Sequence, residues 1–570
     1  AEATDTDTLT SFNNNGFTVG GDVKVNTSGE EYVSWTFRKA PGFFDVVTYS
    51  GNEVDGRAIS HNLGVKPSSI WIKCRNSAED FACWYQALHS TGNMLRLNQP
   101  DTSDGFDSRY NDEPTDSVFY VGTDNQVNAS GGKTYVAYLF AGAAGDGAFG
   151  DDGDQDIIRI GSYVGNGATP AGPVVNVGFE PQWLLIKKVT DASAPWYIYD
   201  TMRGWPVSPT ASPHSITTLL RPSTTDSEVG GTWASNNLSK TGFQIRDDDA
   251  HFNTADQTYI YMAIRTDMIT TPTDATKLFD VNTYNGDGQN SIEISVSTRP
   301  DLLILKSRNN AYGNVWSVHD RLRGAGRELR TNVATVEYDS YDKIEELGND
   351  HYELGSTNEQ NEGSSTYMNY VWTRAKGFFD IVAYTGTGSA RTIAHSLGVA
   401  PEMMWVKARG SDQSWSVYYG DNTDVMFFND EAAGADDARY WNDTTPTDTV
   451  FSIGTDHATN SSGISFVAHL FATLAGISKI GTVTHSGSST NVDCGFSNGA
   501  RFVMLKRIDS TGGWFCWNSV RGIVTGNDPY LLWNTTDAEV TNTDFIDPLS
   551  SGFQISANEN SQTYIFYAIA

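Results

Sequence analysis

YVSWTFRKAPGFFDVVTY at residues 32–49 decides the fold, because a near copy, YMNYVWTRAKGFFDIVAY, returns at residues 367–384. In both copies an alternating apolar run is followed by a basic, glycine-containing link and then by Phe-Phe-Asp. The copies start 335 residues apart. A long internal period is typical of tandem modules, so the stretch marks the seam between one module and the next.

Six segments repeat the apolar run before the seam, and their period-2 alternation predicts β-strands in the middle of a sheet. Their positions are residues 32–37, 135–140, 259–264, 367–372, 466–471 and 564–569. In the second of these closing strands, alternate residues from Tyr135 to Leu139 lie on one face and those from Val136 to Phe140 on the other. We expect one face in the module core and the other against a neighbouring module or chain.

A second repeated pattern is a short apolar run that ends in lysine. Four copies start with proline, at residues 67–73, 181–187, 300–306 and 401–407, and a fifth at 500–506 lacks it. Apolar runs after a proline predict buried strands entered from a turn. The lysines that end these Pro/Lys strands are Lys73, Lys187, Lys306, Lys407 and Lys506. We expect them at the module rim, with the stem packed and the ammonium in water; the alternative is a ligand contact on every module.

These patterns predict an all-β fold, an elongated tandem array of antiparallel β-sandwich modules of about 100 residues each. The modules are 42–144, 156–266, 277–376, 377–475 and 476–570, numbered one to five, with linkers at 145–155 and 267–276. Modules one and four share SHNLG-type turns and PTD entries, whereas two, three and five share an Arg-Gly pair. The chain therefore resembles a three-module unit used twice, with contacts mainly between neighbours.

Residues 1–41 form the second half of a further module, because there are six closing strands but five Pro/Lys strands. An unpaired sheet edge is prone to association. We expect this half-module to be completed by strands of a longer precursor, by another chain, or within module one.

Composition excludes several classes of function. The net charge of −31 argues against nucleic acid and anionic membranes as partners, since phosphate binding needs clustered Lys and Arg. No apolar run approaches the roughly 18 residues of a membrane-spanning helix. The four cysteines form two local pairs, Cys74 with Cys83 and Cys494 with Cys516. Each pair is either a bridge between neighbouring strands or two buried free thiols.

Three groups of residues are candidates for sites. Asp152, Asp154 and Asp156 alternate in a Gly-rich linker, which lets calcium ligands converge, but the rest of the EF-hand pattern is missing and a solvated acidic spacer is favoured. His61 and His395 occupy equivalent turns, where a turn hydrogen bond is favoured over a metal. Trp84, Trp205, Trp441 and Trp533 can stack on sugars, but packing inside or between modules is the commoner role.

Catalysis has no recognisable signature here. The H-E-x-x-H and P-loop patterns are missing from the sequence, and no strand–turn–helix context for a nucleophile elbow or a Rossmann fingerprint is predicted. A single active site also does not need five copies of its fold. We therefore expect no enzyme and no cofactor, with calcium at the three aspartates as the one exception.

The seam stretch, together with SHNLGVKP at 60–67 and NASGGKTYVAYLF at 128–140, resembles repeats in tail-fibre-like and other virion structural proteins of marine tailed bacteriophages. The resemblance extends over nearly the whole chain but includes no virion-anchoring segment. It implies a virion appendage, such as a tail fibre or surface decoration, made of β-sandwich modules that serve host attachment or display. The expected partners are copies of the chain itself, other virion proteins and host-surface glycans, outside the particle. The alternatives are a lectin-like adhesin, an extracellular filament or surface-layer protein, and a polysaccharide-degrading enzyme.

Overall fold

The computed structural model describes residues 5–14, 16–30, 32–91, 93–100, 104–105, 109–169, 171–189, 194–203, 219–228, 236–245, 249–266, 268–290, 292–309, 315–339, 342–559 and 561–570. Within these residues the predicted all-β class is confirmed, and every strand pairing is antiparallel. The helical segments are short: η1 (Gln86–Thr91), η2 (Ala275–Lys277), α1 (Asn358–Asn361), α2 (Ala438–Trp441) and α3 (His457–Asn460). None of the helices in this part of the chain is long and apolar enough to cross a membrane.

Each module contains one large sheet with the same spatial order: first strand, closing strand, Pro/Lys strand, then the strands that follow. Module one has β3 (Phe44–Ser50), β10 (Thr134–Phe140), β5 (Ser69–Cys74), β6 (Ala82–Tyr85), β7 (Asn93–Arg96) and β8 (Asp104–Gly105). Module two has β11 (Ile158–Val164), β17 (Thr258–Arg265), β13 (Pro181–Lys188) and β14 (Trp196–Asp200). Module three has β18 (Phe279–Asn285), β26 (Thr366–Trp372), β20 (Leu302–Ser307), β21 (Ser317–Asp320), β22 (Arg327–Arg330) and β23 (Tyr338–Asp339).

The last two modules follow the same plan. Module four has β27 (Phe379–Thr385), β34 (Ser465–Phe471), β29 (Met403–Ala408), β30 (Ser416–Tyr418), β31 (Asp424–Phe427) and β32 (Ala435–Asp436). Module five has β35 (Ser478–His485), β42 (Gln562–Ile569), β37 (Phe502–Arg507), β38 (Phe515–Asn518) and β39 (Leu531–Leu532).

A smaller sheet in each module separates the two module types. It has two strands in module one, β4 (Arg57–Ser60) and β9 (Val118–Val121), and in module four, β28 (Arg391–Ala394) and β33 (Val450–Ile453). The other three modules have three strands: β12 (Val174–Asn176), β16 (Gly242–Ile245) and β15 (Asn236–Ser239); β19 (Ile292–Ser295), β25 (His351–Leu354) and β24 (Ile344–Leu347); β36 (Thr490–Asp493), β41 (Gly552–Ile555) and β40 (Ile546–Leu549). The division made from the SHNLG and Arg-Gly motifs thus matches a difference in strand number.

The seam between modules is a tight turn built on one glycine. Gly42 and Gly377 have φ values of 69° and 76°, in the left-handed region that favours glycine. Around them the backbone closes onto itself, through the bridges Ala40 to Phe44 and Ala375 to Phe379. The turn sends the chain from the closing strand of one module directly into the first strand of the next.

Five closing strands lie in the middle of their sheets, as predicted: β10, β17, β26, β34 and β42. In β10, Tyr135, Ala137 and Leu139 are fully buried, while Val136 and Tyr138 on the opposite face are half-buried. In β34 all seven residues are buried. The second face of a closing strand is therefore covered completely in module four and incompletely in module one.

The sixth closing strand is not formed, which corrects the prediction for residues 32–37. This segment has no ladder partner in the structure. In the other modules a closing strand is held by the first strand on one side and by the Pro/Lys strand on the other. Neither strand is present in the described residues of the half-module, so residues 32–37 make no ladder hydrogen bonds there.

The rest of the half-module keeps the local structure of the repeat. The hairpin of β1 (Leu9–Asn13) and β2 (Gly16–Val19) takes the place of β15 and β16 in module two. The hydroxyl of Tyr32 donates to Val23 O and accepts from Thr27 N, as Tyr367 does with Asn358 O and Glu362 N. Residues 9–32 thus fold like part of a module whose sheet is missing.

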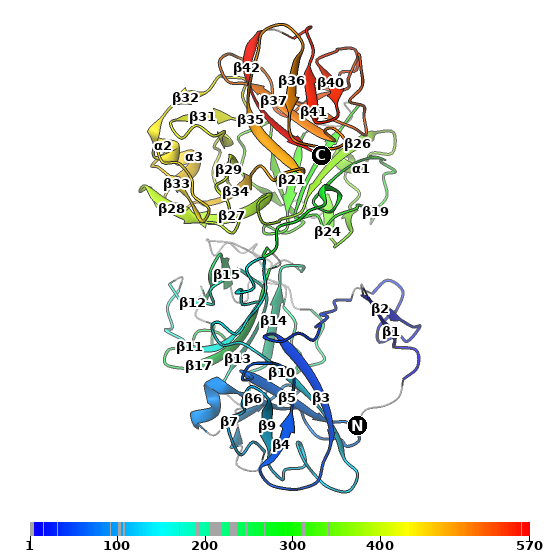
Figure 1. Ribbon diagram of the computed structural model, residues 1–570, viewed down its shortest axis with the longest axis vertical. Helices are drawn as coiled ribbons and strands as arrows, with labels where there is room; N and C mark the ends of the chain where they lie inside the picture. The colour runs from blue at the N-terminus through cyan, green and yellow to red at the C-terminus, as the bar shows by residue number, and fades with distance from the viewer. Residues whose placement is uncertain are drawn as a thin grey trace.

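The modules gather into two bodies (Figure 1). Modules one and two form the lower body, and modules three, four and five form the upper one, with module three on the green side and module four on the yellow side. The hairpin β1–β2 stands apart at the side of the lower body. Modules three to five do not stand in a line; module three contacts module five as well as module four.

Candidate functional site: the interfaces between modules

Four tryptophans stand at equivalent positions, just after the Pro/Lys strand of their module. Trp196 starts β14, and Trp316, Trp415 and Trp514 directly precede β21, β30 and β38. In the last three the backbone N–H donates to an asparagine side chain of the same module, at Asn332, Asn429 and Asn534. This bond fixes the backbone at the sheet edge, where the indole reaches the neighbouring module.

The indole N–H groups connect modules three, four and five in a closed cycle. Trp316 Nε1 donates to Leu532 O of module five at 2.8 Å, and Trp415 Nε1 to Arg330 O of module three at 2.7 Å. Trp514 Nε1 donates to Phe427 O of module four at 3.0 Å. Each module holds one neighbour and is held by the other, so we call this arrangement the three-module ring.

The lysines of the Pro/Lys strands follow the same cycle, and the prediction that they lie at the rim is wrong for four of the five. Lys187, Lys306, Lys407 and Lys506 are at most 1% exposed. Lys306 Nζ donates to Thr536 O, Lys407 Nζ to Ala334 O, and Lys506 Nζ to Glu431 O and Ala432 O. The water expected around each ammonium is replaced by backbone carbonyl groups, at least one of which belongs to a neighbouring module.

Burial makes these ammonium groups weaker bases. Removal from water disfavours the charged form, which lowers the pKa of Lys306, Lys407 and Lys506 to about 8 in each case. The neighbours that oppose the effect are carboxylates, such as Asp412 and Glu337 beside Lys407. The interfaces therefore contain groups that titrate close to neutral pH.

Aromatic side chains fill the centre of the three-module ring. Five aromatic side chains from all three modules, each at most 2% exposed, form a cluster that we call the aromatic hub: Trp372, Trp405, Phe471, Phe502 and Trp533. Trp405 lies 4.3 Å from Phe471 and 5.5 Å from Trp533, measured between ring centroids. Trp372 lies 5.9 Å from Phe502. Aromatic pairs at such distances add to the stabilisation from burial alone.

Ion pairs close the outer part of two of the three interfaces. Arg308 pairs with Glu539 of module five, and Arg409 with Glu337 of module three, each through two hydrogen bonds of 2.8–2.9 Å. The backbone N–H of each glutamate donates to the carbonyl of its arginine at 2.9 Å. Bidentate pairs of this kind fix register as well as contributing energy.

Modules one and two repeat a single interface of the ring. Trp196 Nε1 donates to Arg96 O at 2.9 Å, and Lys187 Nζ donates to Pro100 O at 3.1 Å. These are the contacts that module five makes with module four. The lower body thus has one such interface where the upper body has three.

The two candidate histidines have the turn role favoured by their sequence context. His61 Nδ1 accepts from Leu63 N and His395 Nδ1 accepts from Leu397 N, both at 3.2 Å. The other ring nitrogen faces a backbone carbonyl, Thr115 O or Thr447 O. Burial lowers the pKa of both imidazoles and keeps them neutral. Each histidine therefore fastens its SHNLG-type turn to the small sheet.

The three aspartates proposed for calcium do not converge. Asp156 accepts from Gly145 N, Gly147 N and Arg159, and Asp154 accepts from Gln155. The ligand atoms of Asp152, Asp154 and Asp156 do not all lie within 4.8 Å of one another. Calcium binding at these residues stays a prediction.

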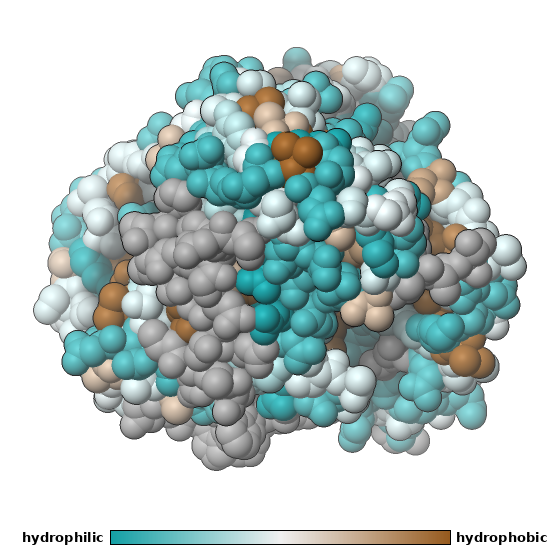
Figure 2. Space-filling model, turned by 90° about the horizontal axis from the view of Figure 1, so that it is seen from below, coloured by the Kyte–Doolittle hydropathy of each residue, from teal (hydrophilic) through white to brown (hydrophobic). Residues whose placement is uncertain are grey.

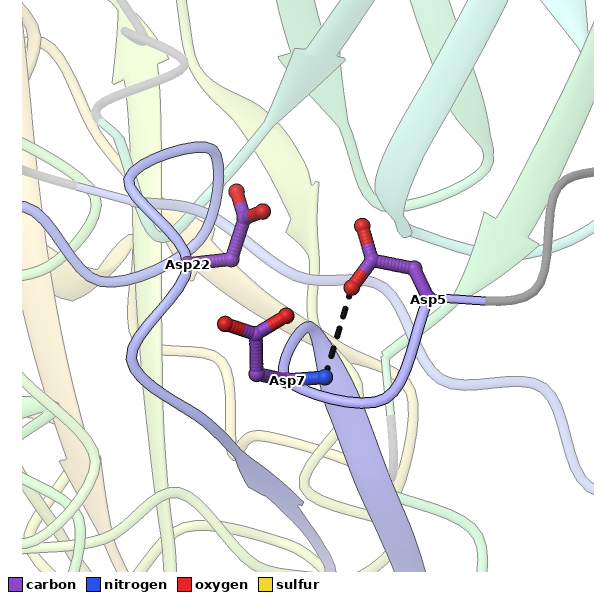
Figure 3. A group of neighbouring side chains, drawn as sticks. All are labelled: Asp5, Asp7 and Asp22. Carbon is purple, nitrogen blue, oxygen red and sulfur yellow. Dashed lines mark hydrogen bonds between the residues drawn. The ribbon is translucent and has the colours of Figure 1, made fainter.

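A different acidic group lies in the half-module. Figure 3 shows Asp5, Asp7 and Asp22 close together on the loops beside the hairpin. Asp5 and Asp7 are exposed, and Lys24 pairs with Asp5 and Asp22 at 3.5 Å. Exposed acidic groups of this kind are common without a metal, and Lys24 already compensates part of the charge.

The tryptophans considered for sugar stacking are core residues where the structure describes them. Trp84, Trp441 and Trp533 are at most 1% exposed, and Trp205 lies outside the described residues. The face seen from below is largely hydrophilic, with apolar residues in small separate patches (Figure 2). Packing, the role favoured for these residues, is thus the one observed.

The two bodies meet at a buried ion network. Arg374 Nη1 and Nη2 bind Glu180 at 2.8 Å, and Nη2 also binds Asp380 at 2.7 Å. Lys240 Nζ binds Glu180 and Asp380 from the module-two side. A pocket beside the network is lined by Lys240, His395 and Asp448 among others. The buried charges of the ion network are already paired with each other, so the network joins module two to module four.

All four cysteines are buried and free. Of the two possibilities left open by the sequence, the structure contains the free thiols. Burial raises the pKa of Cys83, Cys494 and Cys516, which keeps these thiols protonated.

A single family model matches the chain twice, over residues 1–267 and 274–570, and it describes a domain of unknown function, DUF7483. The chain belongs to the DUF7483 family. Each match covers one body: the half-module with modules one and two, and then modules three to five. The DUF7483 repeat thus coincides with the three-module unit inferred from the sequence. No curated protein matches the chain.

The interface residues had a signal in the sequence that motif reasoning missed. A tryptophan follows the strand-ending lysine after eight to ten residues in modules two to five, at Trp196, Trp316, Trp415 and Trp514. Module one has Phe81 at this position. A lysine and a tryptophan that recur eight to ten residues apart indicate a repeated acceptor, which here is the backbone of a neighbouring module.

Proposed function

We propose that this DUF7483 protein is a non-enzymatic structural protein of a virion, an appendage or surface decoration that presents rigid modules outside the particle. The observation that carries the proposal is the three-module ring. Its most distinctive polar side chains, the tryptophans and lysines described above, bind backbone carbonyls of neighbouring modules. Groups used in this way contribute rigidity and register to the assembly.

Two further features support a structural role. The candidate sites are used for structure: the histidines hold turns, and the described tryptophans fill cores. The acidic surface, with a net charge of −31, keeps a protein soluble when it is present in many copies. The resemblance of the seam and turn motifs to phage virion repeats supports the proposed location on a virion. Host attachment, copies of the chain and other virion proteins as partners follow from that location.

Immunogold electron microscopy of purified particles tests the proposal. An antibody raised against modules three to five is expected to label the outside of intact particles at fixed positions. Gold only on cell-surface material, with none on purified particles, would support the filament or surface-layer alternative and reject a virion role. A glycan array with the same protein separates the lectin-like alternative.

A further inference from the structure

The lower body presents the interface of a three-module ring that has one position vacant. Modules one and two occupy two positions, because their contacts match those between modules four and five. In the third position, which module three occupies in the upper body, the described part of the chain places residues 32–37 and no large-sheet strand. The question is what fills it.

This segment already sits where a closing strand belongs. Trp35 Nε1 donates to Asp200 Oδ2 at 3.2 Å, and the guanidinium of Arg203 lies 5.7 Å from the ring. In the upper body the equivalent residue, Tyr370, binds Asn518 and Arg521. These two residues occupy the positions in module five that Asp200 and Arg203 have in module two.

The next aromatic residue repeats the match. Phe37 lies 5.9 Å from Phe140 and 6.3 Å from Trp183. Trp372, its equivalent, lies 6.3 Å from Phe471 and 5.9 Å from Phe502. Residues 32–37 therefore contact modules one and two as β26 contacts modules four and five, but without strands on either side.

Module one keeps the residues that would contact the occupant. Trp71, Lys73 and Phe81 are half-buried, whereas their counterparts Trp405, Lys407 and Trp415 are 2%, 0% and 1% exposed. Lys73 Nζ turns back to Glu79 O of its own module, while Lys407 Nζ reaches Ala334 O of module three. The difference in burial is confined to the face that module three covers in the upper body.

We propose that this face binds the large-sheet strands of one more DUF7483 module. These strands would lie beside residues 32–37 as the strands within residues 277–343 lie beside β26 in the upper body. Those strands would pair with residues 32–37 on both sides and place backbone carbonyls opposite Lys73. A second copy of the chain is a poor occupant, because its five large sheets already hold their own closing strands. The inference goes beyond the proposed function and does not depend on it.

A chimera tests the proposal: residues 274–343 placed directly before Leu9 of the full chain. We expect the amides of residues 33–37 to exchange with solvent about 100-fold more slowly than in the present chain, because they join a ladder. A matched chimera with Trp316→Ala in the added copy should keep this protection and lose part of the protection at residues 219–221 of module two, where Arg221 is the counterpart of Leu532. Unchanged exchange at 33–37 in a folded chimera overturns the proposal.

A second measurement uses the present chain and stands even if the chimera does not fold. Phe81→Cys should react with a maleimide at least about ten times faster than the buried native Cys516. The rate should be the same at about 1 µM and about 100 µM protein, because the accessibility of this face does not depend on concentration in a chain that does not associate. Slow reaction that depends on concentration would mean that a second copy covers this face, and would overturn the proposal.

Discussion

Single polar side chains hold the modules together by reaching across module boundaries to backbone carbonyls. Burying a polar group is costly unless it is hydrogen-bonded, so each donor needs its acceptor and each acceptor its donor. This mutual dependence makes the tryptophans and lysines of the ring sensitive to conservative changes.

Trp415→Phe removes one interface donor and keeps an aromatic ring. The carbonyl of Arg330 loses its partner in a buried site, so the free energy of unfolding should fall by about 1–3 kcal/mol. Trp517→Phe is the matched control, because Trp517 Nε1 is buried with no hydrogen-bond partner in the described residues. Equal effects of the two variants in denaturant titrations would show that the indole bond contributes nothing specific.

The buried lysines predict a pH dependence. Burial lowers the pKa of Lys407 to about 8 in the folded chain. Between pH 8 and the ordinary lysine pKa near 10.5, the unfolded chain therefore binds more protons than the folded chain. Stability from this group therefore rises with pH in that window, by up to about 1.4 kcal/mol per unit. Lys407→Met should flatten the rise, measured by denaturant unfolding at pH 7.5 and 9.5, and exposed Lys277→Met should not. Parallel profiles for wild type and Lys407→Met would contradict the burial of a titrating ammonium.

Asp528 should have the opposite sign. Its carboxyl is 0% exposed, Oδ1 accepts from Val524 N, and Oδ2 has no partner among the described residues. Burial, with Asp544 and Asp547 nearby, raises its pKa to about 7. The folded state then binds the extra proton, so this group lowers stability as pH rises from about 4 to 7. Asp528→Asn should raise the melting temperature at pH 8 and change it little at pH 4.5; a loss of stability at pH 8 would be the contrary result.

At the element scale, a strand is defined by its neighbours as much as by its own residues. Residues 32–37 have the same alternation as residues 135–140, yet only the second segment is paired. Period-2 patterning therefore predicted five closing strands correctly and failed where the flanking strands are missing. The same limit applied to the lysines, because an apolar run followed by lysine has one pattern whether water or a neighbour's carbonyl receives the ammonium.

Hydrogen exchange on the present chain checks this difference between elements. The amides of residues 135–140 and 466–471 should be among the most protected, since each strand is held by two others. The amides of residues 33–37 should exchange far faster. Equal protection of residues 33–37 would show that the half-module already has ladder partners.

At the scale of the whole molecule, the sequence predicted the modules and the three-module period but not the ring. Length and repeat spacing determine how many modules exist, whereas ring closure depends on contacts between module three and module five, more than 200 residues apart in examples such as Trp316 and Leu532. The repeated Lys and Trp positions indicate that modules touch, yet they do not tell a closed cycle from a line. That distinction needs the third interface.

The junction of the two bodies should be a distinct point of weakness. Arg374→Met leaves Glu180 and Asp380 buried with less positive charge, at a cost of about 3–5 kcal/mol. We expect calorimetry to separate unfolding of the lower body from that of the upper one. Lys376→Met, which removes the more exposed pair with Asp151, should change stability by less than about 1 kcal/mol. A single unchanged transition in Arg374→Met would contradict the role given to this network.

A disulfide between modules three and five tests the ring most directly. Glu539 N donates to Arg308 O at 2.9 Å, which brings the two backbones within the range a disulfide can span. In the double variant Arg308→Cys, Glu539→Cys, mild oxidation should link the two positions within one chain, seen as a reducible linked peptide and a faster band on a non-reducing gel. Each single variant should stay unlinked. If the folded double variant does not form this link, modules three and five are out of reach of each other. That result would contradict the three-module ring.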